Sequence, residues 1–231
     1  MLIILPAYNE GKNLMDMLAK IKDRYRILVI DDGSTDNTAK IAQEAGVSLI
    51  KHEANKGLGA SLFDGFLRAL EQNEDVIVTM DADNTMDASL IPHMADLVKD
   101  GHDIVIASRY QKGAVVECVP VYRKIMSTAA SFICRIVFKI PVKDYSSGYR
   151  AYNAGVIRQA INRYGAGFIT SSGFDCQIEI LRKLQPFAKN IAEIPIRLNY
   201  TAKLGHSSFR FGKTFRGYIR QLSNALKEMP S

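Results

Sequence analysis

The sequence has little of several residue types that mark particular protein classes. It contains no tryptophan, seven prolines and three cysteines in 231 residues. The cysteines, Cys118, Cys134 and Cys176, are far apart and odd in number, which argues against a disulfide framework and against a zinc site. No proline-rich linker, repeat or low-complexity segment divides the chain. We therefore expect a single globular domain over residues 1–231 in a reducing cytoplasm.

Long hydrophobic runs are also absent. The most apolar uncharged stretch, residues 125–134, is ten residues long, whereas a helix that spans a bilayer needs about 18 or more. The chain opens on apolar residues 2–5, with no basic region or cleavage site around them. We therefore expect neither a secretory signal nor a membrane-spanning helix.

Charge is distributed unevenly along the chain. The formal net charge is +6, and the seven Lys and Arg residues after position 196 are accompanied by a single acid, Glu228. The preceding 196 residues hold 23 basic and 23 acidic side chains, so the whole excess lies in the C-terminal segment. Such a segment indicates an anionic partner, namely a membrane, a phosphate ligand or a nucleic acid, or else a solvated helix face.

Short apolar runs alternate with stretches of helical periodicity. The expected strands are residues 2–5, 27–30, 48–51, 76–80, 103–107 and 191–200. The expected helices are residues 11–23, 34–45, 58–72, 87–99, 122–138, 172–185 and 213–228. Because the strands are apolar on both faces, the pattern predicts an α/β fold with a mostly parallel central sheet in a three-layer sandwich. We expect the second half of the chain to complete the same domain.

Polar residues follow the expected strands where each of them ends. They are residues 6–10, 31–36, 81–83 and 108–110. In an open parallel sheet, ligands bind outside the carboxyl ends of the strands, so these segments should meet at one edge. Carboxylates gathered there are costly unless a divalent cation or a hydrogen-bonded ligand neutralises them. This edge is the predicted functional site.

Three of these motifs also have simpler interpretations. Ser34 and Asp36 suit the cap and first turn of the following helix, although capping does not explain Asp31. An Asp-x-Asp such as residues 81–83 is common in turns, and its place at the end of a buried strand is what favours metal binding. Residues 57–59, Gly-Leu-Gly, lack the third glycine of a dinucleotide fingerprint, so we interpret them as a helix-entry turn.

The motifs are most informative as an ordered set. They are PAYNE (6–10), DDGSTD (31–36), NKGLGASLFDGF (55–66), DAD (81–83), SRY (108–110), YRK with a later serine (122–127) and SSGYRAY (146–152). Together they resemble family 2 glycosyltransferases of the GT-A fold, nearest to the dolichyl- or polyprenyl-phosphate mannosyltransferase branch. The resemblance implies a nucleotide-sugar-binding half at residues 1–110 and an acceptor-binding half at residues 111–231.

The resemblance implies a donor site for a sugar nucleotide, commonly GDP-mannose or UDP-glucose, with Mg²⁺ or Mn²⁺ at the DAD motif. Its expected lining is Pro6, Tyr8, Glu10, Ile30, Asp31 and Asp32 around the nucleoside, Asp81 and Ala82 at the ribose and phosphates, and Asp83 at the metal. Asp83 offers a hard oxygen to a cation that also holds the leaving diphosphate. Many relatives have Gln two residues later, where this chain has Thr85, a weaker ligand; Asn84, Asp87 or water is the alternative.

On the acceptor side, Arg109, Arg123 and Ser127 resemble residues that hold the phosphate of the acceptor. Arg123 and Ser127 are four residues apart on an expected helix and therefore share one face. A lipid phosphate is already ionised at neutral pH, so its attack on the anomeric carbon needs orientation and charge neutralisation but no strong base. The resemblance thus implies a single inverting displacement, with Asp81, Asp83 and Arg109 as catalytic residues.

The C-terminal segment has two expected roles. Residues 203–210 resemble the basic loop that closes over the diphosphate in relatives, with Lys203 and Arg210 supplying charge and His206 serving as a polar loop residue rather than a base. The last helix carries a basic stripe formed by Lys213, Arg216, Arg220 and Lys227. Together with the apolar residues of the 122–138 helix, this stripe is expected to dock on an anionic membrane surface.

The sequence therefore predicts a peripheral enzyme on the cytoplasmic face of a membrane that moves a hexose, foremost mannose from GDP-mannose, onto dolichyl or polyprenyl phosphate. The alternative is a family 2 transferase that uses UDP-glucose or another nucleotide sugar, or that acts on a sugar hydroxyl with Asp144 or Asp175 as base. A non-catalytic nucleotide-sugar or anion-binding module is a third interpretation, against which the DAD motif, Arg109 and Arg123 argue. Nucleic-acid binding has no recognisable motif behind it. A membrane partner protein is an alternative route to the lipid.

Overall fold

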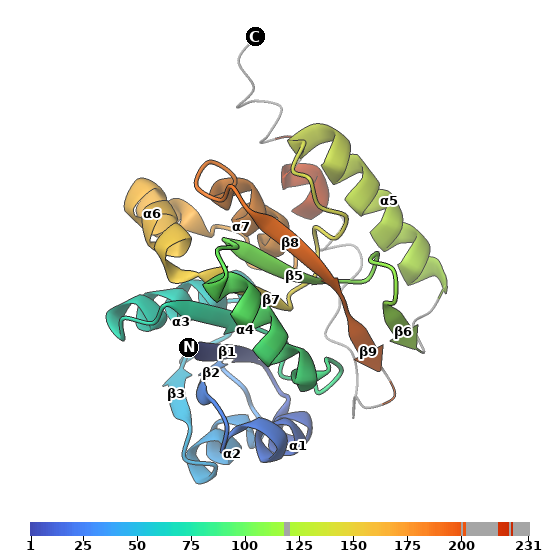
Figure 1. Ribbon diagram of the computed structural model, residues 1–231. Coiled ribbons are helices and arrows are strands. Elements are labelled where there is room, and N and C mark those ends of the chain that lie inside the picture. Colours follow the sequence, from blue (N-terminus) through green and yellow to red (C-terminus); the bar gives the residue numbers. More distant parts are fainter. Residues whose placement is uncertain (118–120, 200, 202–216, 222, 224–231) are drawn as a thin grey trace.

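The computed structural model describes residues 1–117, 121–199, 201, 217–221 and 223, without the side chains of residues 121–126 and 130. Its centre is a seven-stranded sheet with the strand order β3-β2-β1-β4-β7-β5-β8 (Figure 1). The strands are β1 (Leu2–Ala7), β2 (Arg26–Asp31), β3 (Ser48–Lys51), β4 (Val76–Thr79), β5 (Ile104–Ser108), β7 (Arg150–Asn153) and β8 (Ile191–Pro195). Only β7 runs antiparallel to its neighbours, β4 and β5. The predicted α/β architecture with a mostly parallel sheet is confirmed.

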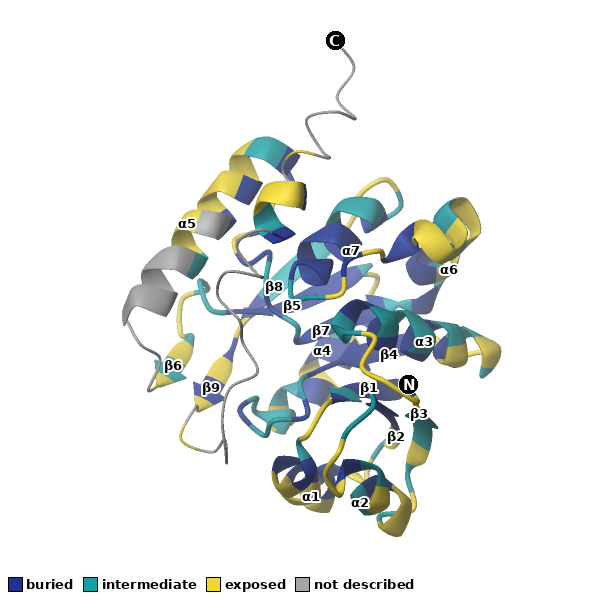
Figure 2. Ribbon diagram, turned by 180° about the vertical axis from the view of Figure 1, so that it is seen from behind, coloured by how far each residue is buried: buried dark blue, intermediate teal, exposed yellow. Residues whose placement is uncertain are grey.

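Helices cover both faces of this sheet. One face packs against α1 (Gly11–Ile21), α2 (Thr38–Glu44) and α4 (Ile91–Lys99), the last of them preceded by the 3₁₀ turn η1 (Ala88–Leu90). The other face packs against α3 (Leu58–Glu71), α5 (Val121–Phe138), α6 (Ala154–Tyr164), the 3₁₀ turn η2 (Gly165–Phe168) and α7 (Cys176–Leu184). Successive residues of β1 alternate between the two cores, which explains why the central strands are apolar throughout and buried (Figure 2).

Three elements were missed by the sequence analysis: the short strand β6 (Val115–Glu117), the strand β7 and the helix α6 that follows β7. The strand β7 has the sequence Arg-Ala-Tyr-Asn, and its Arg150 is fully buried. Arg150 donates hydrogen bonds to the carbonyl oxygens of Gln177 and Tyr145, at 2.9 and 2.8 Å. These hydrogen bonds offset the cost of removing the guanidinium from water. A hydropathy pattern does not reveal such long-range hydrogen bonds, so a charged residue in a buried strand was not expected.

The C-terminal part of the sheet also differs from the prediction. The single strand expected at residues 191–200 is two strands, β8 in the main sheet and β9 (Arg197–Asn199), which pairs in parallel with β6 (Val115–Glu117) in a separate small sheet. Most of the helix expected at residues 213–228 lies outside the described residues. Within it, residues 217–221 and 223 are helical.

The glycines of the 57–59 motif are explained by close backbone approach. Gly57 has a φ of +95°, and a Cβ at Gly57 or Gly59 would collide with the carbonyl oxygens of Ser172 and Ser171, respectively. The entry to α3 is therefore pressed against the loop at residues 169–172. The interpretation as a helix-entry turn is correct as far as it goes, but the contact with this distant loop is the stronger requirement for glycine.

We expect Gly59→Ala to lower the free energy of unfolding by about 1–3 kcal/mol, because the new methyl group forces two backbone segments apart. Helix propensity alone would act in the opposite direction by about 1 kcal/mol. The control is Gly167→Ala, since a Cβ at Gly167 meets no atom within 4 Å. Urea unfolding of the two variants gives the comparison, and equal stability would contradict this account of the motif.

Candidate functional site

The ends of β1 and β2 are tied together at the carboxyl edge of the sheet. The backbone N–H of Asn9 donates to Ser34 Oγ at 2.9 Å, and Asn9 Oδ1 accepts from the backbone N–H of Thr35 at 2.8 Å. The backbone N–H of Gly11 donates to Asp36 Oδ2 at 3.1 Å. Asp36 also accepts from the backbone N–H of Thr38, in the first turn of α2. Ser34 and Asp36 therefore fasten the PAYNE loop to the DDGSTD loop, beyond the capping role that was the simpler interpretation.

The two acids that end β2 have different surroundings. Asp31 is fully buried; its Oδ1 accepts from the backbone N–H of Ser34 at 3.1 Å, while its Oδ2 has no hydrogen-bond partner among the described residues. Asp32 accepts three hydrogen bonds, from His52 Nδ1 at 2.7 Å and from the backbone N–H groups of Lys56 and Gly57 at 2.8 and 2.7 Å. The carboxylate of Asp32 is thus occupied by protein groups rather than presented to a ligand.

The other residues expected around a nucleoside lie at the same edge with unequal exposure. Tyr8 is 40% exposed, while Pro6 and Glu10 are half-buried. Ile30 is fully buried in the core beneath α3. The sequence alone cannot distinguish an apolar residue that packs in the core, such as Ile30, from one that contacts a ligand.

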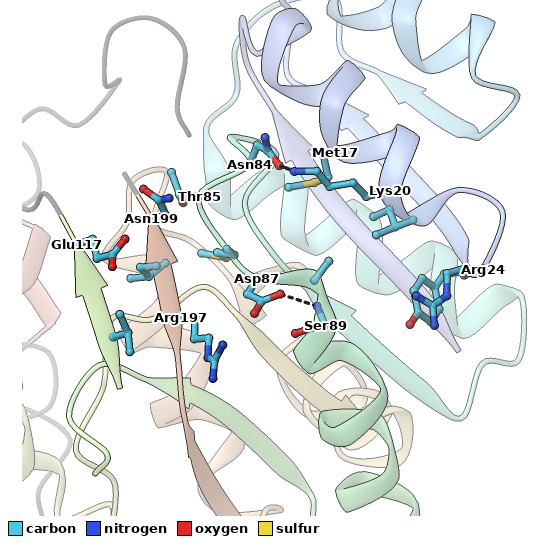
Figure 3. Close-up of a pocket in the computed structure, with 16 residues that line it drawn as sticks. Met17, Lys20, Arg24, Asn84, Thr85, Asp87, Ser89, Glu117, Arg197 and Asn199 are labelled. Atoms are coloured by element: carbon cyan, nitrogen blue, oxygen red, sulfur yellow. Dashed lines mark hydrogen bonds between the residues drawn. The ribbon is translucent and has the colours of Figure 1, made fainter. Parts of the chain in front are cut away.

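The DAD motif follows β4 directly. Asp83 Oδ1 accepts hydrogen bonds from the hydroxyl and the backbone N–H of Thr85, at 2.7 and 3.2 Å. Asn84 has a φ of +60° and accepts from Lys20 Nζ at 2.9 Å, and Asp87 accepts from the backbone N–H of Ser89 at 2.9 Å (Figure 3). Each of the residues considered for the metal shell after Asp83 therefore already has a role inside the protein. Over the described ranges, no group of three or more His, Cys, Asp or Glu is arranged to hold a metal ion.

A turn at residues 144–148 joins the DAD motif to the end of β5. Thr79 donates to the carbonyl oxygen of Gly148 at 2.9 Å, and a Cβ at Gly148 would lie 3.2 Å from Asp81 Oδ1. At the other end of the turn, the Asp144 carboxylate accepts hydrogen bonds from Arg109, from Nε at 2.8 Å and from Nη2 at 2.6 Å. The expected donor residues and the expected acceptor residue Arg109 are thus brought together by one short segment.

Asp144 and Arg109 form a buried ion pair. Asp144 is fully buried, and it also accepts from the backbone N–H groups of Arg109 and Ser147, both at 3.0 Å. Burial alone would raise the pKa of Asp144, but the guanidinium of Arg109 and these hydrogen bonds hold the pKa below its ordinary value. Burial opposes the charge on Arg109, and the attraction of Asp144 outweighs it, so the pKa of Arg109 is raised. Asp144 is therefore ionised and fully coordinated at neutral pH.

Arg109 keeps part of its guanidinium accessible. Its side chain is 24% exposed. Its Nη2 donates to Ser146 Oγ at 2.6 Å as well as to Asp144, and among the described residues no hydrogen bond is made by Nη1. Tyr218, from the C-terminal helical segment, hydrogen-bonds the side chain of Ser146, and burial raises the pKa of Tyr218 to about 12. Asp144 and Ser146 thus fix one edge of the guanidinium and leave the other without a hydrogen bond among the described residues.

Tyr110 connects Ser127 to Arg109. Tyr110 and Ser127 share a hydrogen bond of 2.8 Å between their hydroxyl oxygens, and the Arg109 guanidinium lies 5.6 Å from the centre of the Tyr110 ring. Arg123 lies one turn before Ser127 on α5, with its side chain outside the described residues. Tyr110 and Ser146 were missed as individual members of this cluster, although both lie inside motifs that the sequence analysis quoted.

Asp175 forms a second acidic pairing with arginine. It is buried and accepts from Arg220 Nη2 at 2.8 Å, and Arg220 also donates to Ser171 Oγ at 3.0 Å. Arg220, expected in the basic stripe, is 54% exposed, and its guanidinium also anchors the last helical segment to the body of the domain. Lys213, Arg216 and Lys227, with Lys203, His206 and Arg210 of the expected loop, lie outside the described residues.

A pocket of about 550 Å³ lies beside the DAD loop (Figure 3). It is bounded by the last turns of α1, residues 84–89 and the small β6–β9 sheet. Its charged lining consists of Lys20, Arg24, Asp87, Glu117 and Arg197. Pro6, Tyr8 and Glu10 do not line this pocket, so it is not the expected donor site. The pocket and the expected donor site are neighbours at the loop that follows the DAD motif.

Comparison with known proteins identifies the family of the chain. The profile described as "Glycosyl transferase family 2" matches residues 2–160. Dolichol-phosphate mannosyltransferase of Pyrococcus furiosus is 35% identical over 97% of this chain, which spans 63% of the length of that relative. Undecaprenyl-phosphate mannosyltransferase of Micrococcus luteus is 32% identical over 91% of this chain and 88% of the relative.

The fold has a counterpart among solved structures. Glucosyl-3-phosphoglycerate synthase from Mycobacterium tuberculosis, solved with Mn²⁺, UDP-glucose and phosphoglyceric acid, superposes with a TM-score of 0.66 at 18% identity, over 100% of this chain and 80% of that one. In the part of the chain that the structure describes, no helix is long and apolar enough to cross a bilayer. The match over residues 2–160, the 35% identity and the GT-A architecture have one explanation: the chain belongs to glycosyl transferase family 2.

Proposed function

We propose that this protein transfers a hexose, foremost mannose from GDP-mannose, onto polyprenyl or dolichyl phosphate in a single inverting displacement. Two relatives, at 35% and 32% identity, carry names that describe mannosyl transfer involving dolichol phosphate and undecaprenyl phosphate. The observation that carries the proposal is that both carboxylates available as a base for a hydroxyl acceptor, Asp144 and Asp175, are paired with arginines.

This pairing favours an acceptor that arrives already ionised. A general base must take a proton during the reaction, and a carboxylate held by a guanidinium and by backbone N–H groups has its proton affinity reduced. The lowered pKa of Asp144 expresses this directly. A sugar hydroxyl has to lose a proton as it attacks, whereas a phosphate monoester does not. The second acceptor class is therefore the less favoured one.

The acceptor phosphate is proposed to bind at the Arg109 cluster. The free edge of Arg109 provides charge-assisted hydrogen bonds, and Ser127, oriented by Tyr110, provides a hydroxyl. Arg123, one turn before Ser127 on α5, supplies a second guanidinium. Because Asp144 fixes the other edge of Arg109, the anion meets a group that is already oriented, which lowers the entropic cost of binding.

The donor is proposed to lie on the other side of the 144–148 turn. Its nucleoside would contact Pro6, Tyr8, Glu10, Asp31 and the backbone of Ile30, with Asp32 supporting the wall of the site, and its ribose and phosphates would contact Asp81 and Ala82. Lys203 and Arg210 would neutralise the diphosphate from the following loop.

Asp83 is the proposed protein ligand of Mg²⁺ or Mn²⁺. Proteins often hold Mg²⁺ through one or two carboxylates together with substrate phosphates. The groups present fit that pattern, because Asp83 is oriented by two hydrogen bonds from Thr85, whose hydroxyl supports the ligand rather than acting as a second one. When bound, the cation would assist departure of the diphosphate as a Lewis acid. The M. tuberculosis synthase of similar fold was solved with Mn²⁺ and UDP-glucose.

A membrane surface is the proposed partner of α5, on the cytoplasmic side. Phe132, Ile133 and Ile136 on this helix are 64%, 46% and 59% exposed, and Ile219 of the last helical segment is 51% exposed. Tyr218, next to Ile219, packs against the core cluster that also contains Cys134 of α5. The apolar side chains of the two helical segments thus belong to one region near the Arg109 cluster, where a phosphate on a lipid would reach it. A membrane partner protein remains the alternative.

The direct test is transfer of labelled hexose from GDP-mannose, UDP-glucose or UDP-N-acetylglucosamine to polyprenyl phosphate, measured as label that passes into organic solvent. We expect transfer with Mn²⁺ or Mg²⁺ and foremost from GDP-mannose. Transfer from a UDP-sugar would correct the donor, while transfer only to a water-soluble sugar would overturn the proposed acceptor.

The same assay includes two variants as controls. Asp83→Ala is expected to reduce transfer roughly a hundredfold or more, because it removes the carboxylate that holds the cation. Asp96→Ala removes an exposed carboxylate that pairs with Lys99 on α4, away from the sheet edge, and should keep the wild-type rate. A folded Asp83→Ala protein with full activity would refute the assignment of the metal ligand.

We expect a Phe132→Ser, Ile136→Ser double variant to bind anionic vesicles at least about tenfold more weakly than wild type. Withdrawing these side chains from a bilayer interface forfeits more than ~1.4 kcal/mol of apolar burial. Cosedimentation with phosphatidylserine-containing vesicles measures the effect. Met15→Ser is the matched control, since Met15 is 56% exposed on α1. Equal binding of all three proteins would mean that α5 does not face the membrane.

A further inference from the structure

His52 lies between two carboxylates at the edge of the expected donor site. It follows β3 and is buried, and its Nδ1 is 2.7 Å from Asp32 Oδ1 while its Nε2 is 2.9 Å from Asp64 Oδ2. Asp64 is on α3, with its side chain 34% exposed. Neither the resemblance nor the proposed chemistry assigned a role to His52 or Asp64.

The hydrogen bonds determine how many protons the ring carries. An ionised carboxylate only accepts hydrogen bonds, and a neutral imidazole has a single N–H. Both contacts of His52 are hydrogen bonds only if both ring nitrogens carry hydrogen, so the geometry corresponds to an imidazolium between Asp32 and Asp64. The other charged groups on the surrounding segments include Asp31 on β2, with Lys51, Glu53 and Lys56 nearby along the chain, and Arg68 one turn after Asp64 on α3.

Asp32 connects this imidazolium to two loops. Its carboxylate accepts from the backbone N–H groups of Lys56 and Gly57, and its own backbone N–H donates to the carbonyl oxygen of Ala7 at 2.9 Å. The PAYNE loop begins there, and the turn at residues 55–57 leads into α3. A change in the hold on Asp32 would therefore act both on the end of β1, where the expected nucleoside site begins, and on the turn at residues 55–57.

We propose that His52, in its doubly protonated form, is a positioning residue of the donor site: it holds Asp32, and through Asp32 the turn at residues 55–57, in the geometry that receives the nucleotide. The inference rests on the proposed function only in that it takes this edge as the donor site. It does not depend on the identity of the sugar or the acceptor.

Loss of one proton from His52 would weaken this arrangement. A neutral ring that donates from Nδ1 to Asp32 turns the lone pair of Nε2 towards Asp64, and the opposite tautomer turns a lone pair towards Asp32. Either way one hydrogen bond becomes a repulsive contact, so the hold on Asp32 is lost as the pH rises. Replacing Asp64 with Asn removes the need for the charge, because the amide N–H₂ donates to a neutral Nε2 while Nδ1–H still donates to Asp32.

The first measurement is amide hydrogen exchange at Lys56 and Gly57 between pH 6 and 9, expressed as protection relative to an unstructured peptide at the same pH. We expect the wild-type protection to fall about tenfold between the two ends of this pH range, equivalent to ~1.4 kcal/mol. In Asp64→Asn the protection should not change with pH. If both proteins behave alike, or if the ring NMR shifts show a neutral His52 at pH 6, the imidazolium is not what holds Asp32.

The second measurement is calorimetric binding of GDP and of UDP with Mn²⁺ to the same proteins. Affinity should weaken about tenfold at high pH in the wild type and stay constant in Asp64→Asn. Constant wild-type affinity despite a pH-dependent turn would overturn the role in the donor site, and so would failure to bind either nucleotide. Intact nucleotide binding without transfer to polyprenyl phosphate would instead refute the proposed acceptor and leave this inference standing.

Discussion

Three carboxylates in the interior of this protein, those of Asp32, Asp144 and Asp175, each meet a basic side chain: His52, Arg109 and Arg220, respectively. An ionised carboxylate left alone in such surroundings would cost several kcal/mol. The pairing with these bases, and at Asp32 and Asp144 also with backbone N–H groups, therefore stabilises the loops at the sheet edge. Removing one partner of such a pair typically destabilises a protein by roughly 3–5 kcal/mol.

These pairs also decide what the site can do. Asp144 holds one edge of Arg109 and leaves the other accessible, so a structural ion pair produces an oriented anion-binding group. Asp175 uses Arg220 to fasten the last helical segment to the loop that Gly57 and Gly59 approach closely. The same carboxylates that the sequence offers as bases are both paired with arginine. We propose that the remaining groups at this edge hold two phosphorylated ligands side by side.

Much of the fold was predictable because its strands are buried on both faces and read as uninterrupted apolar runs. The strand β7 was not, because Arg150 is compensated by carbonyl oxygens of distant segments. At the site, the strand ends identified the edge of the sheet at which the quoted motifs meet. Which of two adjacent acids binds protein groups and which keeps an unpartnered oxygen depends on contacts with residues 52 and 56–57, and local sequence does not encode such contacts.

The central claim is that an already ionised acceptor attacks without a carboxylate base. It is tested most directly by the pH dependence of single-turnover transfer at saturating donor, with polyprenyl phosphate compared with its phosphorothioate analogue. Because the pKa of Asp144 is held below its ordinary value, its titration contributes nothing near neutrality. The account predicts a constant rate above about pH 7 and a fall near pH 6, at the second ionisation of the phosphate, with a midpoint that moves to lower pH for the phosphorothioate. A midpoint that is the same for both acceptors, and that shifts in Asp175→Asn, would contradict it.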